Sequence, residues 1–267
     1  MPVNYKIALL MTLFAGLATV LGGFFTFFIK RTNMKALSVG LGFSAGVMIF
    51  LSFTEILDGA KELLIKYFPT NAEWMVFIGF AIGIVIAVLI DYFMPDHIEE
   101  DLFSVKDNCS NSLCSHHHKI KRAGLLTAIA ICVHNFPEGI ATFFVASQNL
   151  AIGATVALAI ALHNIPEGIA VALPIYHATG KKRLAIWYTF LSGISEPIGA
   201  LAGMFVLKTF LPEAAVGFLF AAVGGIMVYI SFDTLLPLSR EYGDDHYSVF
   251  GILFGVFFIW TSLLLLG

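Results

Sequence analysis

Two copies of a polar hexapeptide carry the residues of this sequence that are best suited to binding a metal ion. The first copy reads His-Asn-Phe-Pro-Glu-Gly at 134–139, and the second reads His-Asn-Ile-Pro-Glu-Gly at 163–168. In each copy the His and the Glu are four positions apart, so on a helix they share one face, one turn apart. Imidazole and carboxylate groups are suitable ligands for Zn²⁺, Fe²⁺, Co²⁺ and Mn²⁺. The duplicated pair therefore predicts a divalent metal site.

Each hexapeptide lies inside an apolar stretch long enough to cross a bilayer. A charged side chain at the centre of a membrane helix costs about 2.5–3.5 kcal/mol on insertion scales, so such residues usually have a function. The alternative is that the His and Glu side chains only form hydrogen bonds between helices. Duplication of the whole motif at matching depth favours a functional site over this structural interpretation.

Other residues could complete the ligand shell. Asn135 and Asn164 lie between the His and Glu positions and offer amide oxygens, and Glu196 is a third buried carboxylate in the next apolar segment. Three carboxylates leave room for two metal ions, or for one ion and exchangeable protons. Pro137 and Pro166 have no N–H, so they free a backbone carbonyl and bend the helix at the polar centre. The predicted ligands are His134, Asn135, Glu138, His163, Asn164, Glu167 and Glu196.

The elements that must position these residues are membrane helices. The chain is 58% hydrophobic with a mean hydropathy of +0.88, which excludes a water-soluble domain. Apolar runs near 20 residues span a bilayer as helices, and these runs do not alternate as barrel strands do. We expect an all-α membrane protein with eight transmembrane helices, a single domain over 1–267, and the metal site between the fourth, fifth and sixth helices. The predicted spans are 5–29, 37–57, 74–94, 125–146, 150–176, 184–210, 214–238 and 249–266.

The distribution of Lys and Arg predicts the orientation. Eleven of them fall in the loops on one side of the predicted helices and four on the other. Because Lys and Arg accumulate in cytoplasmic loops, we expect both termini outside the cytoplasm. The first apolar run is too long for the core of a cleaved signal peptide and is interpreted as the first helix. Three cysteines provide no disulfide framework.

A second, weaker repeat links the second and seventh predicted helices. Gly-Val-Met-Ile-Phe-Leu-Ser-Phe at 46–53 is similar to Gly-Ile-Met-Val-Tyr-Ile-Ser-Phe at 225–232. These two helices run in opposite directions, as do the two helices that carry the hexapeptides. Both repeats indicate an inverted pseudo-two-fold axis in the membrane plane, which is typical of transporters. Chance similarity between Gly- and Phe-rich segments is the alternative for this second match.

Several other polar residues each allow two interpretations. The loop at 95–122 contains Cys109, Cys114 and His116–His118, but this spacing matches no standard zinc site, so a solvated linker competes with a metal-binding loop. Outside this loop, some acidic residues and one His could line the paths to and from the site, or could be interfacial charges. They are Glu55, Asp58, Asp91, His177 and Asp233.

At the two hexapeptides the chain resembles the ZIP (ZRT/IRT-like protein) family of divalent metal transporters. The eight helices, the external termini and the His-containing loop also fit, so the resemblance covers essentially the whole chain. It implies uptake of zinc, and also of iron, manganese, cobalt and cadmium, across the bacterial plasma (inner) membrane into the cytoplasm. It implies the seven ligands named above, with no prosthetic group and no enzymatic activity. In some family members the position of Asn164 is an aspartate, so the amide here lowers the negative charge of the site.

Two other functions use the same buried cluster. An intramembrane metalloenzyme also needs a metal and a Glu, but the sequence has no H-E-x-x-H motif, and a duplicated ligand set favours transport over one reaction centre. A proton or cation channel could relay protons through the His and Glu residues. We expect the lipid bilayer as a partner, a possible homodimer through small-residue helix faces, and no nucleic acid.

Overall fold

A computed structural model describes residues 5–30, 32–93, 112–206, 213–243 and 245–266, which are helical apart from short connecting turns, with no strand among them. The all-α fold class is therefore confirmed. The helices are α1 Tyr5–Phe25, η1 Thr26–Phe28, α2 Met34–Leu51, η2 Ser52–Ile56, α3 Leu57–Ile65, α4 Ala72–Phe93, α6 Ser112–Gln148, α7 Leu150–Thr179, α8 Lys182–Val206, α9 Glu213–Ile230, η3 Ser231–Leu235, α10 Leu236–Tyr242 and α11 Asp245–Leu266.

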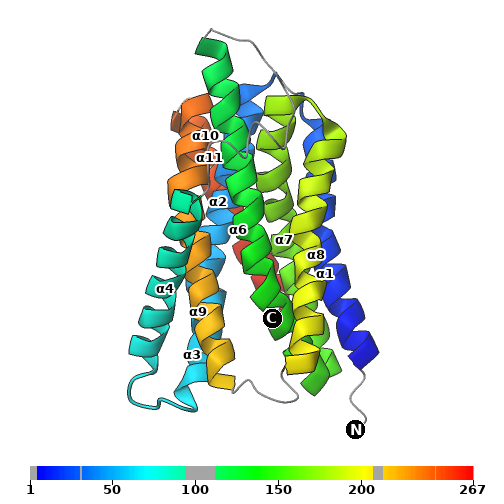
Figure 1. Ribbon diagram of the computed structural model, residues 1–267, viewed down its shortest axis with the longest axis vertical. Coiled ribbons are helices and arrows are strands. Elements are labelled where there is room, and N and C mark those ends of the chain that lie inside the picture. Colours follow the sequence, from blue (N-terminus) through cyan, green and yellow to red (C-terminus); the bar gives the residue numbers. More distant parts are fainter. Residues whose placement is uncertain (1–4, 31, 94–111, 207–212, 244, 267) are drawn as a thin grey trace.

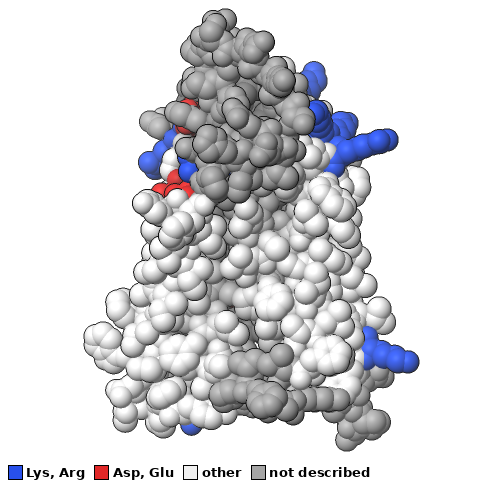
Figure 2. Space-filling view, in the orientation of Figure 1, with Lys and Arg blue, Asp and Glu red and all other residues white. Residues whose placement is uncertain are grey.

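Seven helical segments of the described chain are long and apolar enough to cross a membrane. The remaining predicted span corresponds to α8, whose 25 residues have sufficient length but which is not among these seven segments, so the count of eight spans stays a prediction. On the face shown in Figure 2, the Lys, Arg, Asp and Glu side chains that are described lie at the two ends of the molecule, and the surface between them is uncharged. This uncharged band is the surface expected of a protein surrounded by lipid.

The long helices pack into two groups that lie side by side (Figure 1). In the first bundle, α1 packs on α7 and α8, and α6 packs on α7 and α8. In the second bundle, α2 packs on α11 and α4 packs on α9. Through the short turns η2 and η3, α3 continues α2 and α10 continues α9. The bundles meet chiefly where α2 contacts α7 and where α6 contacts α9. Both hexapeptides therefore lie in the first bundle, on the two helices that face the second.

The two similar segments of the second repeat both form a π-helical turn. In η2 and η3 the backbone N–H after the turn bonds to the carbonyl five residues earlier, that of Ser52 and of Ser231. The hydroxyl of Ser52 donates to the carbonyl of Met48 at 2.7 Å, and that of Ser231 donates to Met227 at 2.8 Å. A hydroxyl that binds the carbonyl one turn back competes with the normal helical bond, which favours the wider turn.

The boundary of one predicted loop is wrong. We expected a loop over 95–122, but α6 begins at Ser112, so the last part of that segment is helical. The run from Ser112 to Arg122 contains no Gly or Pro, and extending an existing helix costs far less than starting a new one. Cys109 lies outside the described residues. Cys114 and His116–His118 belong to α6 by their backbone, and their side chains lie outside the described part of the chain.

Two tight turns fix the direction of the helices that carry the hexapeptides. Asn149 joins α6 to α7, and its side-chain oxygen accepts a bond from the N–H of Ala151 at 3.0 Å, which caps α7. At the other end, Gly180 adopts φ 68 and donates its N–H to the carbonyl of Tyr176 at 2.8 Å. Glycine favours this left-handed conformation just after a helix. Both turns are short, so α6, α7 and α8 are antiparallel neighbours.

Candidate metal centre

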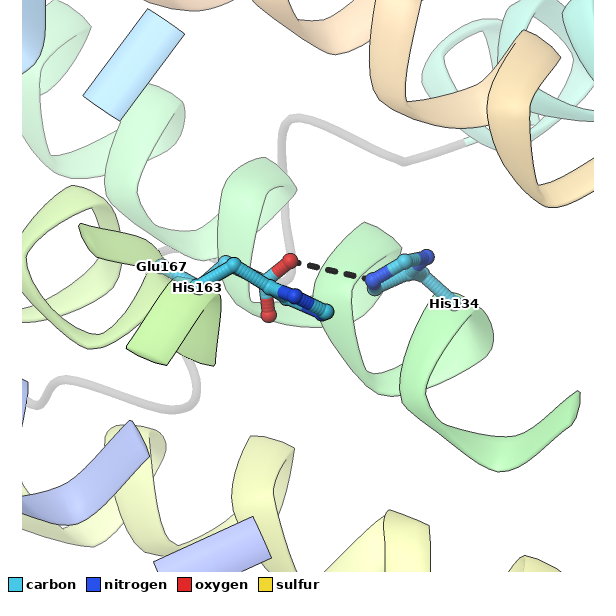
Figure 3. A group of neighbouring side chains, drawn as sticks. All are labelled: His134, His163 and Glu167. Atoms are coloured by element: carbon cyan, nitrogen blue, oxygen red, sulfur yellow. Dashed lines mark ion pairs between the residues drawn. The ribbon is translucent and has the colours of Figure 1, made fainter. Parts of the chain in front are cut away.

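Four side chains of the two hexapeptides meet between α6 and α7. The imidazole Nε2 of His134 lies 3.0 Å from a carboxylate oxygen of Glu167, and that of His163 lies 2.6 Å from Glu138. Within α6, His134 and Glu138 are 3.5 Å apart, as their spacing predicts. Figure 3 shows the Glu167 carboxylate of α7 pointing toward His134 of α6, with His163 beside it. Each His thus faces the Glu of the other helix.

These four side chains are almost completely excluded from solvent. Their exposed fractions are 1% for His134, 5% for Glu138, 6% for His163 and 0% for Glu167. One ligand atom from each of His134, His163 and Glu167 can be chosen so that all three lie within 4.8 Å of one another. Two imidazoles and two carboxylates that converge in a buried space form a donor set suited to a borderline divalent cation.

The two asparagines hold the hexapeptides against neighbouring helices. The Asn135 amide donates to the carbonyl of Ser192 in α8 at 3.1 Å, and the Asn164 amide donates to the carbonyl of Ala15 in α1 at 2.9 Å. The Asn164 amide also donates to a carboxylate oxygen of Glu196 at 2.8 Å. Each amide therefore fixes its side chain through nitrogen, which leaves the oxygen as the atom available to a cation.

Three buried oxygens of these residues have no hydrogen-bond donor in the described part of the protein. They are Oδ1 of Asn135, Oδ1 of Asn164 and Oε1 of Glu196. Buried acceptors without a donor are uncommon because desolvation is then uncompensated. Their chemistry fits a second, oxygen-rich subsite beside the His and Glu cluster. The structure thus brings Glu196 to Asn164 and gives it no described contact with either histidine.

The glycine that ends each hexapeptide lies against a neighbouring backbone. A Cβ at Gly139 would collide with the carbonyl oxygen of Glu196, and a Cβ at Gly168 would collide with that of Thr19. Glycine is therefore required by the close approach of α6 to α8 and of α7 to α1. Each hexapeptide thus combines candidate ligands with a small residue that allows two helices to pack closely beside them.

The prolines do not interrupt their helices. Pro137 lies within α6 and Pro166 within α7, and both helices continue through them. The irregular turns occur in the second bundle instead, at η2 and η3. A further contact that the sequence did not indicate is the hydroxyl of Ser44, which donates to the carbonyl of Pro166 at 2.7 Å.

The other polar residues singled out in the sequence are not members of the buried cluster, although Glu55 is close enough to His163 for an electrostatic interaction. Glu55, Asp58 and Asp233 are exposed. Asp91 forms an ion pair with Arg122 at 3.7 Å, and the buried His177 has its Nδ1 3.0 Å from the carbonyl of Leu173, one turn earlier in α7. None of these residues belongs to the group of metal-ligating side chains found in the described chain.

Comparisons with known proteins agree with this geometry. The family model described as ZIP Zinc transporter matches residues 95–262. Relatives named zinc transporter ZupT include one from Akkermansia muciniphila, 46% identical over 94% of this chain and 94% of its own. Others come from Clostridium perfringens, 44% identical over 98% and 96%, and from Nitratidesulfovibrio vulgaris, 46% identical over 98% of both chains. A family match over most of the chain and this degree of identity show that the protein belongs to the ZIP family of zinc transporters.

Proposed function

We propose that this protein takes up Zn²⁺, and also Fe²⁺, Mn²⁺, Co²⁺ and Cd²⁺, into the cytoplasm through the buried cluster on α6 and α7. As a ZIP-family member it is a divalent metal transporter of a membrane, not an enzyme. The observation that carries the proposal is the convergence of two His and two Glu side chains from antiparallel membrane helices. The proposed ligands are His134, Asn135, Glu138, His163, Asn164, Glu167 and Glu196.

An inverted repeat relates α1 to α8, α2 to α9, α4 to α11 and α6 to α7. If each helix is exchanged for its counterpart, a strongly packed pair is replaced by another strongly packed pair. The pair α2–α11 is replaced by α9–α4, and the pair α1–α7 is replaced by α8–α6. The π-helical turns η2 and η3 occupy matching places in α2–α3 and α9–α10. Both facts support the symmetry that the two sequence repeats predict.

The contacts near the site support the same symmetry. The carbonyls that receive the asparagine amides are those of Ala15 in α1 and Ser192 in α8. Each directly precedes a glycine, and a Cβ on either Gly16 or Gly193 would collide with the carbonyl oxygen of the other. The axis therefore passes near this glycine pair, beside the metal ligands, where inverted-repeat transporters bind their substrate.

The division into two bundles suggests the moving parts. All seven proposed ligands lie on α6, α7 and α8 of the first bundle, and none lies on the second. A metal ion held this way can travel with the first bundle as it shifts against the second, which exposes the ion first to one side of the membrane and then to the other. The interface between the bundles is where such a shift must occur.

The transport proposal predicts saturable uptake by the purified protein in sealed liposomes. Zn²⁺, Fe²⁺, Mn²⁺ and Cd²⁺ are tested separately for the wild type and for Glu138→Ala, which removes the carboxylate beside His163. Saturable uptake by the wild type that is lost in the variant supports a carrier and ranks the metals. Wild-type uptake in Glu138→Ala contradicts the ligand set, and uptake that never saturates indicates a channel.

The orientation is proposed from the excess of Lys and Arg at the end of the molecule that holds the α7–α8 turn. Asn71 lies at the opposite end, between α3 and α4, and both Asn71 and Lys181 are exposed. In intact cells and a cysteine-free background, we expect a membrane-impermeant maleimide to label Asn71→Cys and not Lys181→Cys. Lysed cells provide the control, because both cysteines then react. If only Lys181→Cys is labelled in intact cells, the proposed orientation is wrong and the opposite orientation is supported.

A further inference from the structure

One buried hydrogen bond crosses the interface between the bundles next to a proposed metal ligand. Ser44 of α2 is completely buried, and its hydroxyl donates to the carbonyl of Pro166 in α7 at 2.7 Å. This carbonyl belongs to the peptide group that joins Pro166 to Glu167. The second bundle thus holds the backbone of the first at the residue before Glu167, whose side chain contacts His134.

Ser44 differs from several other buried hydroxyl residues in these helices, and the buried Ser192 and Ser239 donate to another helix only within their own bundle. Thr127, Thr142 and Ser52 each donate to a carbonyl one turn earlier in their own helix. That local bond is the usual arrangement for Ser and Thr within helices. Ser44 donates instead to a different helix in the other bundle, so its bond exists only while α2 and α7 stay packed together.

The inverted repeat identifies the residue that occupies the corresponding place on the other side of the axis. Ser44 lies eight residues before the serine that opens η2, and Val223 lies eight residues before the serine that opens η3. Pro137 holds the same place in the first hexapeptide as Pro166 in the second. The counterpart of the Ser44–Pro166 contact is therefore the approach of Val223 to Pro137, and valine has no hydroxyl to donate.

The structure is less tightly packed at this second position. Val223 and Pro137 line a cavity of about 10 Å³ together with Glu138, Ile56 and Phe220. This volume is about the minimum that one water molecule needs. The interface is thus joined by a hydrogen bond beside Glu167, and it has a gap without a corresponding bond beside Glu138.

We propose that Ser44 is a positioning residue that favours the conformation in which α7 is packed on α2. The opposite conformation lacks the matching hydrogen bond, because Val223 has no hydroxyl to donate to the carbonyl of Pro137. This inference rests on the proposed inverted repeat and two-bundle movement. When the first bundle shifts, the α2–α7 contact loosens and the α9–α6 contact tightens, so the Ser44–Pro166 bond breaks and no bond replaces it. The hydroxyl thereby sets the ratio of the two conformations.

Two substitutions change this ratio in the same direction for different reasons. Ser44→Ala removes the bond of the packed α2–α7 conformation, and Val223→Ser supplies a donor for the Pro137 carbonyl in the opposite one. Each is expected to shift the ratio about fivefold, the effect of one typical buried hydrogen bond. Ser44→Thr keeps the donor and is expected to retain the wild-type ratio.

The ratio is measured by pulsed electron paramagnetic resonance of the full chain in lipid nanodiscs. Spin labels are placed on cysteines at Met34 of the second bundle and Lys181 of the first, both exposed, with the native cysteines replaced. Ser239→Ala is the matched control, since Ser239 donates to the carbonyl of Ser38 at 2.7 Å within the second bundle. It loses a buried bond between helices but none between bundles, so its ratio is expected to stay at the wild-type value.

The outcomes separate this inference from the transport proposal. A fivefold shift toward the longer separation in Ser44→Ala, absent in Ser44→Thr and Ser239→Ala, supports the role of Ser44. If two distances between the spin labels are found, and their populations have the same ratio in Ser44→Ala, Val223→Ser and the control, then the proposed role of Ser44 is wrong. The proposals of a metal site and of metal uptake are not affected by that result. A single separation in every variant, with and without Zn²⁺, overturns the two-bundle movement itself.

Discussion

Replacing Glu167 by Gln is expected to reduce saturable Zn²⁺ uptake by at least about tenfold, because the change removes the negative charge of a proposed ligand. The shape of the side chain is kept. Glu167 is completely buried, and its carboxylate lies 3.0 Å from the imidazole of His134. An amide in this position adds N–H groups to a site that must accept a cation and lowers its negative charge. The measurement is the initial rate of uptake into liposomes over a range of Zn²⁺ concentrations.

The matched control for this substitution is Glu73→Gln. Glu73 also forms a contact with a basic side chain, 2.7 Å from Lys61, but it is 80% exposed and lies in the first turn of α4. Screening by water leaves such surface pairs with little influence, so uptake in Glu73→Gln is expected to equal that of the wild type. If Glu167→Gln transports Zn²⁺ as fast as Glu73→Gln at every concentration, Glu167 is not a ligand.

The buried cluster could be predicted from local spacing because each hexapeptide places its own candidate ligands. A separation of four residues puts His134 and Glu138 on one helix face. The predicted spans 125–146 and 150–176 leave only a short link, so they form a hairpin in which the two copies face each other. What spacing could not determine is which His meets which Glu. The shorter contacts join different helices, His134 to Glu167 and His163 to Glu138, and depend on the rotation of α6 against α7.

Features that depend on distant segments had no local signal in the sequence. The asparagine amides bond to carbonyls of Ala15 and Ser192, and any residue type offers a carbonyl. The sequences of the two π-helical turns are similar to each other, but each sequence is also compatible with an ordinary apolar α-helix. The second repeat therefore predicted that the two segments correspond, but not that they form π-helical turns. The Ser44 hydroxyl could equally have bonded within its own helix, as the hydroxyl of Ser52 does. Only the packing of α2 on α7 decides between these two bonds.

The second large effect is expected at the glycine that ends each hexapeptide. Gly168→Ala is expected to lower the free energy of unfolding by about 3 kcal/mol. Added methyl groups in a packed interior typically cost about 1–3 kcal/mol, and the cost is highest where the neighbouring atoms cannot move. The new Cβ would collide with the carbonyl oxygen of Thr19, a backbone atom that no side-chain rotation can move. For a chain of this size such a loss lowers the melting temperature by roughly 6–12 °C, which is measured by thermal unfolding of the detergent-solubilised protein.

Gly59→Ala is the matched control, because nothing lies within 4 Å of the Cβ that this change adds in α3. Alanine is favoured over glycine within helices, so this variant is expected to melt at or slightly above the wild-type temperature. To relieve the collision, Gly168→Ala must move α7 away from α1, which weakens the bond from Asn164 to Ala15 and displaces the neighbouring Glu167. Metal affinity should therefore fall together with stability in Gly168→Ala, and neither should fall in Gly59→Ala. If the two variants melt at the same temperature, the close packing of α7 on α1 does not hold the site.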